Sequence, residues 1–345
     1  MQHTLIIRCD GSSSIGMGHI YRCLELADEL STKYNYNIIF AVRQSPQGIQ
    51  IIRSKEFTVI AANEMGFDYE LWLSEIIDNH NAKAIIFDSR DHLEKQILLS
   101  LKKKNVVLIS IDDNEEKRLA CDLVFYPPIP QVLDYGWDSF KGEKYIGWEY
   151  VIIRKEFCVE YDKNNSTTPQ LLISMGGSDP FGFTLRILKI LSDIENYYII
   201  KVIIGPTYTT KSLIYDFQKQ NKFFEIIEDP ENMALIMSQS NLAIASFGVT
   251  AYELASMKIP SAYLCISEDH AKSASLFSDN GCAISLGIHD KITDSELSMK
   301  LNEFLKNTFL QNQMRLNCTK IKLGRGTSTI GSIINKKIVD FHGKC

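Results

Sequence analysis

The 345-residue sequence lacks the usual patterns of a metal or cofactor site. Its eight cysteines include no CxxC pair, and its seven histidines form no HExxH motif. It contains no GxxxxGK[ST] phosphate loop, and the stretch that begins at Gly16 departs from a GxGxxG dinucleotide fingerprint because Tyr21 occupies the third glycine position. We therefore predict that the protein binds no metal and needs no cofactor.

An excess of positive charge and a long apolar segment are also missing. The net charge is −5, which argues against nucleic acid as a partner. The first apolar run, in MQHTLIIRCD, is too short for a secretory signal, and no later run reaches transmembrane length. Several cysteines lie within apolar runs, as reduced buried thiols do. We predict a cytoplasmic protein without a membrane span, and no sequence feature indicates its oligomeric state.

Short apolar runs alternate with amphipathic helical patterns in each half of the chain, which predicts parallel sheets covered on both faces. Helical patterns occupy Tyr69–Asn79, His92–Lys103 and the tail from Asp294 onward. The predicted strands are 5–8, 38–42, 58–60, 84–88, 106–111 and 123–125 in the first half, and 171–175, 199–204, 224–227, 242–245, 261–264 and 283–286 in the second.

A polar stretch, Asp162–Pro169, interrupts this alternation and is the best candidate for a linker. It divides the chain into a first domain at 1–163 and a second domain at 164–345 that includes the C-terminal helices. We predict an α/β protein with two Rossmann-like domains that face each other across a cleft.

The first candidate site is Gly16-Met-Gly18-His19, where the first predicted strand hands over to a helix. Glycines let a ligand approach the backbone, and the amides of a helix start attract anions. The positive end of the helix disfavours a charged imidazole, so His19 is a candidate general base. The same residues also fit a tight turn with a capping histidine, and spacing alone does not separate the two interpretations.

The second half repeats the design of strand, glycine turn and helix. Gly176 and Gly177 follow a predicted strand, and Ser178 and Asp179 follow as candidate caps of the next helix, although such a pair can also be a plain turn. Further along, the amides from Gly248 to Thr250 could hold a pyrophosphate, and Glu253 could accept bonds from ribose hydroxyls. Alternatively, Glu253 complements the helix dipole.

Other polar stretches have an ordinary explanation beside a functional one. Glu268-Asp269-His270 precede a helix, which also fits a polar loop with an N-cap aspartate. Paired acids follow two strands of the first half, Asp88 with Asp91 and Asp112 with Asp113. They suggest metal or acid–base work, but without ligands at matching spacing a solvated loop is the commoner interpretation.

Taken together, these segments resemble a known family. "RCDGSSSIGMGHIYRCLELADEL" resembles the N-terminal signature of the PseG-type UDP-sugar hydrolases, and further echoes follow in the family's order from about residue 6 to residue 265. They are "IIFDSR", "ISIDDNEEKRLACDLVF", "GWEYVIIRKEF", "LLISMGGSDPFGFTL" and "NMALIMSQSNLAIASFGVTAYELA". Related chains include the SpsG-like spore-coat polysaccharide biosynthesis proteins, and the glycine motifs are shared with glycosyltransferases of the two-Rossmann, MurG-like GT-B type.

The resemblance implies hydrolysis of UDP-2,4-diacetamido-2,4,6-trideoxy-β-L-altropyranose at its anomeric carbon, with release of UDP, in bacterial pseudaminic acid or surface polysaccharide biosynthesis. It implies that His19 deprotonates the attacking water. The other positions that match the family's motifs are implied to bind the substrate (Asp10, Gly16, Gly18, Arg22, Asp88 and His270) or the nucleotide (Gly176, Gly177, Gly248, Val249, Thr250, Glu253 and Asp269).

The chain departs from the family on the nucleotide or sugar side. Family members read G-G-S-T-x-Y-E where this chain has Phe247 in place of a glycine and Val249 in place of a serine. A bulky Phe247 would narrow the approach to the phosphates, and Val249 cannot donate a side-chain hydrogen bond. A loop that usually carries E-N-Q or D-N-Q reads Glu268-Asp269-His270. The donor or its sugar is therefore expected to differ, while the His19 motif is intact.

Two other functions fit the same residues. A GT-B glycosyltransferase would use the same fold and base, with an acceptor hydroxyl in place of water. A sugar-nucleotide binding or scaffolding subunit would keep the fold without turnover, and the altered segments around Phe247 and His270 are its support.

Overall fold

The computed structural model describes residues 2–11, 16–43, 45–62, 67–161, 168–205, 208 and 210–343. The chain forms two compact units. The first unit comprises Met1–Pro128, Val132–Arg154 and Gly324–Cys345, and the second comprises Ile129–Gln131 and Lys155–Leu323. Each unit is built around its own parallel β-sheet.

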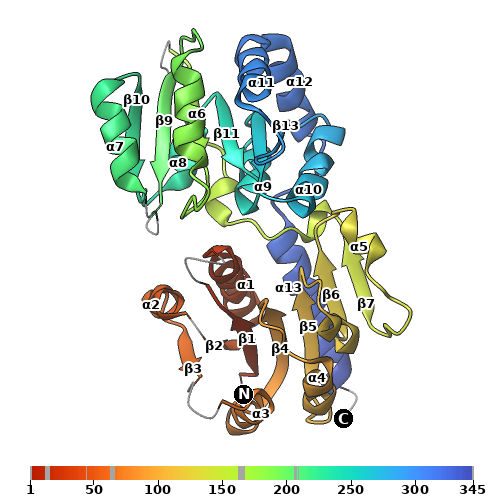
Figure 1. Ribbon diagram of the computed structural model, residues 1–345. Helices are drawn as coiled ribbons and strands as arrows, with labels where there is room; N and C mark the ends of the chain where they lie inside the picture. The colour runs from red at the N-terminus through yellow and green to blue at the C-terminus, as the bar shows by residue number, and fades with distance from the viewer. Residues whose placement is uncertain are drawn as a thin grey trace. The chain divides into compact units, whose positions relative to one another are not determined.

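The first unit has a seven-stranded sheet in the order β3-β2-β1-β4-β5-β6-β7, in which every described neighbouring pair is parallel (Figure 1). Its strands are β1 (Thr4–Cys9), β2 (Asn37–Val42), β3 (Thr58–Ala61), β4 (Ala82–Asp88), β5 (Val107–Ile111), β6 (Leu123–Tyr126) and β7 (Glu143–Ile146). Its helices are α1 (Gly18–Tyr34), α2 (Pro46–Ser54), α3 (Tyr69–His80), α4 (Lys95–Lys102), the 3₁₀ helices η1 (Glu116–Ala120) and η2 (Trp148–Tyr150), and α13 (Gly326–His342). The short helix α5 (Gln131–Asp134) begins at the unit boundary.

The second unit has a six-stranded sheet in the order β10-β9-β8-β11-β12-β13, again with parallel neighbours (Figure 1). Its strands are β8 (Gln170–Ser174), β9 (Ile199–Ile204), β10 (Phe224–Glu228), β11 (Leu242–Ser246), β12 (Ser261–Cys265) and β13 (Ala283–Ile288). Its helices are η3 (Lys155–Phe157), α6 (Phe183–Ser192), α7 (Lys211–Gln220), α8 (Met233–Ser238), α9 (Val249–Ser256), α10 (Glu268–Asp279), α11 (Asp294–Lys306) and α12 (Thr308–Cys318).

Apolar strands and amphipathic helices account for both cores. All residues of β1, β5, β8 and β12 are buried, as expected for strands covered on both faces. In α1 the buried side chains recur at helical spacing, from Ile20 and Cys23 to Ala27 and Leu30, so that one face packs on the sheet. The twelve predicted strands are confirmed, with ends within two residues of those predicted.

The structure differs from the predicted elements at two places. The edge strand β7 was not predicted, because its residues Glu143–Ile146 are exposed or only half-buried and carry no apolar run. The helix predicted from His92 begins only at Lys95, because His92 has a positive φ of 55° and Glu94 is extended. The loop after β4 is therefore longer than predicted.

The unit boundaries also differ from the predicted domains. The 163/164 boundary and most of the predicted linker, residues 162–167, lie outside the described residues. The chain passes from the first unit to the second between Arg154 and Lys155. Moreover, α13 belongs to the first unit, whereas the sequence analysis assigned all C-terminal helices to the second. The physical reason is a buried stripe of Ile330, Ile334 and Ile338, which joins the core of β1, β4 and β5.

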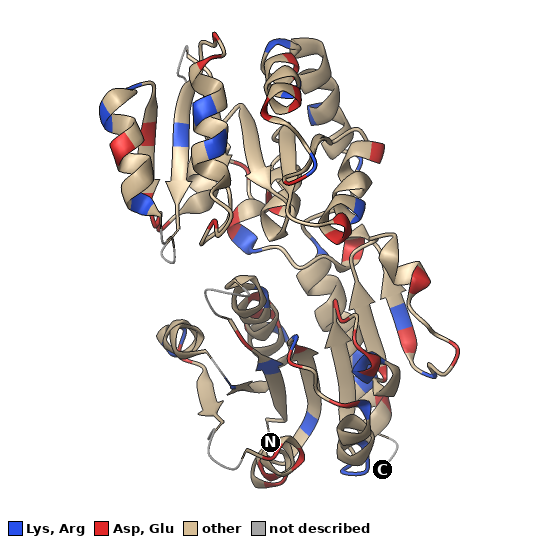
Figure 2. Ribbon diagram, viewed as in Figure 1, with Lys and Arg blue, Asp and Glu red and all other residues tan. Residues whose placement is uncertain are grey.

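Charged residues of both signs are interspersed along the elements of each unit (Figure 2). Within the described residues, no helix combines the length and the apolar character needed to cross a lipid bilayer.

Candidate active site

The candidate catalytic residues gather at the point in the first sheet where the strand order reverses. From β1 the chain runs through β2 and β3 on one side, and β4 then pairs with β1 on the other side. In doubly wound sheets, ligands bind outside the carboxyl ends of the strands at such a reversal. His19 lies in the first turn of α1, which follows β1, and Asp88 is the last residue of β4.

His19 is held by Asp88. The Nδ1 atom of His19 lies 2.7 Å from Oδ1 of Asp88, and the imidazole is 16% exposed whereas Asp88 is 1% exposed. An ionised carboxylate can only accept a hydrogen bond, so Nδ1 is the ring nitrogen that donates to Asp88, and in the neutral imidazole Nε2 carries the lone pair. The arrangement can accept a proton at Nε2, which is the property required of a general base.

Asp88 is held in turn by Arg22 and Cys23 of α1. Nε of Arg22 donates to Oδ2 of Asp88 at 2.5 Å, Nη2 contacts Oδ1, and the Cys23 thiol lies 3.4 Å from Oδ2. Burial alone would raise the pKa of Asp88, but the charges of Arg22 and His19 and their hydrogen bonds hold that pKa well below its usual range. Asp88 is therefore ionised at neutral pH.

The substrate-binding roles that the resemblance implies for Asp88 and Arg22 stay predictions, and both residues have partners within the unit. The carboxylate of Asp88 is buried behind the imidazole, and its oxygens are occupied by neighbouring side chains. The guanidinium of Arg22 is 14% exposed and also donates through Nη1 to Asp112 at 3.2 Å. Both residues support His19 from within the unit.

A second charged cluster occupies the ends of the same two strands. Arg8 is fully buried, with Nη2 2.5 Å from Asp10 and 2.6 Å from Asp91 and with Nε 2.5 Å from the Tyr69 hydroxyl. Asp10 also accepts a bond from the backbone N–H of Arg43 at 2.7 Å. Asp10 is thus engaged at both oxygens and anchors the start of the β1–α1 loop, and its predicted contact with substrate stays a prediction. Burial would raise the pKa of Asp91, but Arg8 and the Tyr69 hydroxyl hold it below its usual range.

The commoner interpretation, that the acidic pairs after β4 and β5 lie in solvated loops, is therefore wrong. Asp88 and Asp113 are buried, and Asp91 and Asp112 pair with arginines. Asp113 lies 3.4 Å from the buried Lys117, and its carboxylate accepts from Ser110 at 3.1 Å. Among the described residues, no group of three or more His, Cys, Asp or Glu side chains is placed to hold a metal ion.

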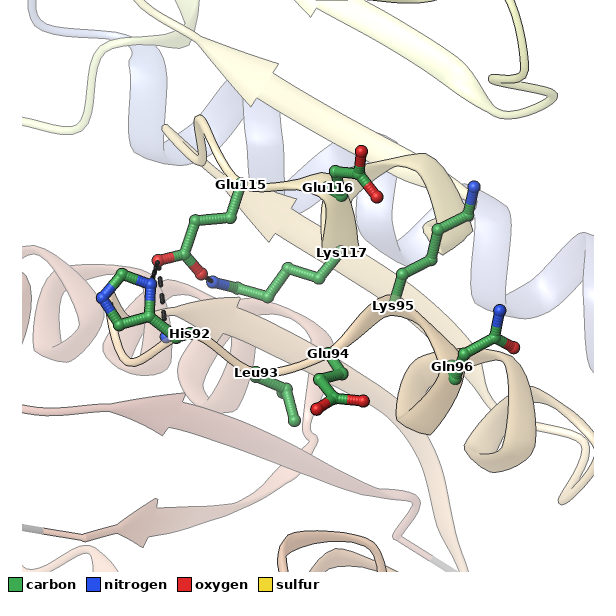
Figure 3. A pocket seen from close by; sticks show the side chains of 8 residues that line it. All are labelled: His92, Leu93, Glu94, Lys95, Gln96, Glu115, Glu116 and Lys117. Carbon is green, nitrogen blue, oxygen red and sulfur yellow. Dashed lines mark hydrogen bonds and ion pairs between the residues drawn. The ribbon is translucent and has the colours of Figure 1, made fainter.

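A hollow of about 450 Å³ lies between the loops that follow β4 and β5 (Figure 3). His92 and Glu115 approach each other across it, with 3.4 Å between Nδ1 and Oε1, and the Lys117 ammonium contacts the same carboxylate. Its lining is formed by 92–96 and 115–117, and therefore includes none of the predicted site residues.

The glycine turn after β8 lies at the corresponding reversal of the second sheet, where β8 pairs with β11. Gly176 has a φ of +83°, which favours glycine, and a Cβ at Gly205 would lie 2.4 Å from the Gly177 carbonyl oxygen. Asp179 caps α6 as predicted: its carboxylate accepts from the backbone N–H of Phe183 and of Thr184, each at 2.8 Å. The helix itself begins at Phe183, later than the Gly-Gly pair suggests.

The loop after β11 leads straight into α9, with Gly248 as the N-cap. Gly248 has no side chain with which to cap this helix, and no acidic residue lies in the first turn of α9. Among the described residues, a Cβ added at Gly248 would meet no atom within 4 Å. Val249 is 37% exposed beside it. Glu253 is 5% exposed and lies beyond the first turn of α9, so it does not complement the helix dipole.

Phe247 turns into an aromatic cluster. Its ring centroid lies 5.9 Å from Tyr263, 5.8 Å from Phe277 and 6.0 Å from His270. Ser267 caps α10 by accepting from the His270 N–H at 3.2 Å, and so takes the capping role that the sequence analysis gave to Asp269. The Asp269 carbonyl accepts from Gln131 at 2.8 Å.

The structure brings together His19, Arg22 and Asp88 in one network of the first unit, and Asp10 lies in the adjacent Arg8 cluster. Sequence reasoning missed Arg8 and Tyr69. A signal for Arg8 existed: it is the one charged residue in the apolar run LIIRC, and a buried charge requires partners.

Two Rossmann-like units of parallel sheet give this chain the GT-B fold. Solved structures with this fold include MurG of Acinetobacter baumannii, with a TM-score of 0.72 and 13% identity over 97% of this chain and 99% of that chain. A glycosyltransferase of Rickettsia africae has a TM-score of 0.69 and 14% identity, covering 98% and 99% of the two chains. At these identities the likeness establishes the fold alone.

Sequence comparisons extend the likeness to particular proteins, although no protein-family model matches the chain. An uncharacterized protein of Methanocaldococcus jannaschii is 29% identical over 270 residues, which are 74% of this chain and 54% of that protein, so the chain spans about half of its length. The UDP-2,4-diacetamido-2,4,6-trideoxy-β-L-altropyranose hydrolase of Campylobacter jejuni is 27% identical over 280 residues, 80% of this chain and 97% of the hydrolase. The spore coat polysaccharide biosynthesis protein SpsG of Bacillus subtilis is 22% identical over 341 residues, 95% and 96% of the two chains. These similarities support the resemblance without singling out one member.

Proposed function

We propose that the protein hydrolyses a UDP-linked amino or deoxy sugar at its anomeric carbon and releases UDP, in nonulosonic (pseudaminic) acid or surface polysaccharide biosynthesis. The observation that carries the proposal is the contact of 2.7 Å between His19 and Asp88, which leaves Nε2 as a proton acceptor at the ligand-binding edge of the first sheet. The names of two relatives support the substrate class, because one is a UDP-sugar hydrolase and the other a polysaccharide biosynthesis protein.

In the proposed step, Nε2 of His19 takes a proton from water while the water oxygen bonds to the anomeric carbon. The bond from that carbon to the β-phosphate oxygen breaks, and its electron pair leaves with UDP. Asp88 keeps the proton of the imidazole on Nδ1 and stabilises the imidazolium that forms. The buried carboxylate is already in place before the substrate binds, so little reorganisation is needed.

We assign the nucleotide to the second unit. Gly248, the N-cap of α9, has no side chain to occupy the N–H groups at the helix start, and the space beside it admits close approach of a phosphate. Gly176 and Gly177 after β8 complete the backbone surface on the side of the neighbouring strand. The amides would stabilise the charge that develops on the departing diphosphate.

Isotope labelling tests the bond that breaks. Turnover of a UDP-sugar in H₂¹⁸O should place the label in the sugar hydroxyl and leave UDP unlabelled, because the water attacks carbon. Label in the phosphate of the nucleotide product would contradict attack at the anomeric carbon. The same reaction with His19→Ala should be slower by about 10²- to 10⁴-fold.

The second candidate is a glycosyltransferase with a UDP-sugar donor, and similar solved structures that include glycosyltransferases favour it. The same base would then deprotonate an acceptor hydroxyl. Release of UDP without any acceptor separates the two functions: fast release supports hydrolysis, and release that waits for an acceptor supports transfer. UDP binding with no turnover of any donor tested would instead support a binding subunit.

A further inference from the structure

We propose that Arg22 is a positioning residue: it holds the carboxylate of Asp88 against the imidazole of His19 and so sets the pH range in which His19 accepts a proton. The inference rests on the role proposed for His19 and assigns Arg22 a role other than the substrate contact that sequence comparison suggests. It is drawn from the geometry of three contacts and from the charges that surround Asp88.

The first observation is the grip of Arg22 on the carboxylate. Nε lies 2.5 Å from Oδ2 of Asp88 and Nη2 contacts Oδ1, so the planar guanidinium faces the planar carboxylate at two points. Nη2 also lies 3.2 Å from Nδ1 of His19. Arg22 and His19 therefore converge on the same carboxylate oxygen, and each fixes the other's geometry through it.

The second observation is that Arg22 is itself fixed from a third element. Nη1 donates to Oδ2 of Asp112 at 3.2 Å, and Asp112 is the first residue after β5, with its backbone N–H bonded to the Phe125 carbonyl at 2.8 Å. One guanidinium thus ties α1 to the ends of β4 and β5. With its hydrogen-bonding edges committed and 14% of the side chain exposed, Arg22 has little left to offer a ligand.

The third observation concerns the charges around the pair of Asp88 and His19. Arg22 and Cys23 face Asp88 from α1, and Cys9 of β1 lies next to Cys23. Asp112 faces Arg22 from the end of β5, and Arg90 reaches Asp112 at 3.7 Å from the loop after β4. Among these described groups, Arg22 is the permanent cation that contacts Asp88 directly.

Removing the cation should change the titration of the pair. Burial raises the pKa of Asp88, and the charge of Arg22 opposes it, so the pKa of Asp88 should rise when Arg22 becomes glutamine. Asp88 and the His19 ring are joined by a hydrogen bond, so the charge on one group affects proton uptake by the other. The pair should then take up its extra proton at a pH about 1–3 units higher than in the wild type. That proton blocks the base.

The test compares Arg22→Gln with Arg22→Lys, which keeps the charge but loses the two-point contact. The rate of UDP release from a UDP-sugar is measured as kcat/KM against pH. Arg22→Gln should move the acidic limb upward by about 1–3 pH units and regain activity at high pH. Arg22→Lys should lower kcat several-fold with the limb in place. The control is Arg118→Gln, which removes another buried guanidinium of the first unit, one bonded to the carbonyls of Asn114, Glu115 and Gly136.

A readout without substrate keeps this inference separate from the proposed function. ¹⁵N resonances of the His19 ring, identified by their loss in His19→Asn, report the pH at which the pair takes up its proton in the free protein. An upward shift in Arg22→Gln but not in Arg22→Lys or Arg118→Gln supports the role, even if no donor is turned over. An unchanged titration in Arg22→Gln would overturn it. If Arg22→Gln did not fold, the pH profile of Arg22→Lys, which retains the charge, would decide. An acidic limb that moved in Arg22→Lys would overturn the role of Arg22, and an acidic limb that stayed in place would support it.

Discussion

The two units share a fold but place opposite chemistry at the same point of the sheet. Between β1 and β4 the first unit collects ionised side chains: Arg22 and Asp88 support His19, and Arg8 lies beside them. Between β8 and β11 the second unit presents glycines, and the Cβ position of Gly248 faces open space. The carboxylate of Asp179, in the loop after β8, accepts hydrogen bonds from the first N–H groups of α6.

The difference indicates what each unit does with its ligand. Buried charges are costly unless they are paired, so a network such as that of Asp88 is retained where it fixes the position and protonation of one group. A diphosphate brings its own charge and is bound well by backbone N–H groups and a helix start, which require close approach and no side chain. Under the proposed function, we expect the reversal of the first sheet to serve proton transfer and that of the second sheet to bind an anion.

The largest expected effect comes from removing the imidazole. His19→Ala should lower kcat by about 10²- to 10⁴-fold, because the base is lost, while the affinity for UDP, measured by calorimetry, should change less than about threefold. A large loss of UDP affinity with turnover largely unchanged would contradict the proposal that His19 serves the chemical step while the second unit binds UDP.

A pH-dependent stability effect should follow from Asp88. Because its pKa is held below the unfolded value, the carboxylate stabilises the fold above about pH 4, and this contribution is lost as the pH falls below that. Asp88→Asn should therefore lower the free energy of unfolding by about 2–3 kcal/mol at pH 7 and by less at pH 3. Urea denaturation at both pH values measures the difference. A deficit that stayed constant with pH would show that Asp88 is not the ionised partner of Arg22.

The strands and helices were predictable because apolar runs and helical periodicity are local signals. The partners of His19 were not, because Asp88 lies 69 residues away in the chain. The sequence places His19 and Asp88 each after a predicted strand, but it does not show that these strands, β1 and β4, are neighbours in the sheet. The edge strand β7 has too few apolar residues to be predicted from the sequence. The helix α13 belongs to the first unit because Ile330 and Ile334 pack in its core, and no local sequence pattern indicates that long-range contact.

Phe247, which stands where the resembled family has a glycine, offers a second test of the contrast between the two units. Its ring packs on Tyr263 and Phe277, so Phe247→Ala should lower the free energy of unfolding by about 2 kcal/mol, less than the 3–5 kcal/mol typical of a fully buried phenylalanine. The affinity for UDP should stay within about threefold. A tighter complex with unchanged stability would mean that the ring narrows the approach to the phosphates, as the sequence alone suggested.

The smallest effect is expected at Gly248, and it is the cleanest probe of the nucleotide site proposed for the second unit. Its φ of 168° is extended backbone that any residue adopts, and a Cβ there meets no atom within 4 Å, so Gly248→Ala should change the free energy of unfolding by less than about 1 kcal/mol. The added methyl would occupy the space through which a phosphate reaches the amides of α9, so UDP should bind about tenfold more weakly, a loss of about 1.4 kcal/mol. Gly136→Ala, at a glycine of the first unit with equally open surroundings, is the matched control and should leave UDP affinity unchanged. Calorimetric titration of UDP into both variants decides the matter. Equal affinities would place the diphosphate elsewhere than at the start of α9, and the proposed contrast between proton transfer in the first unit and anion binding in the second would no longer hold.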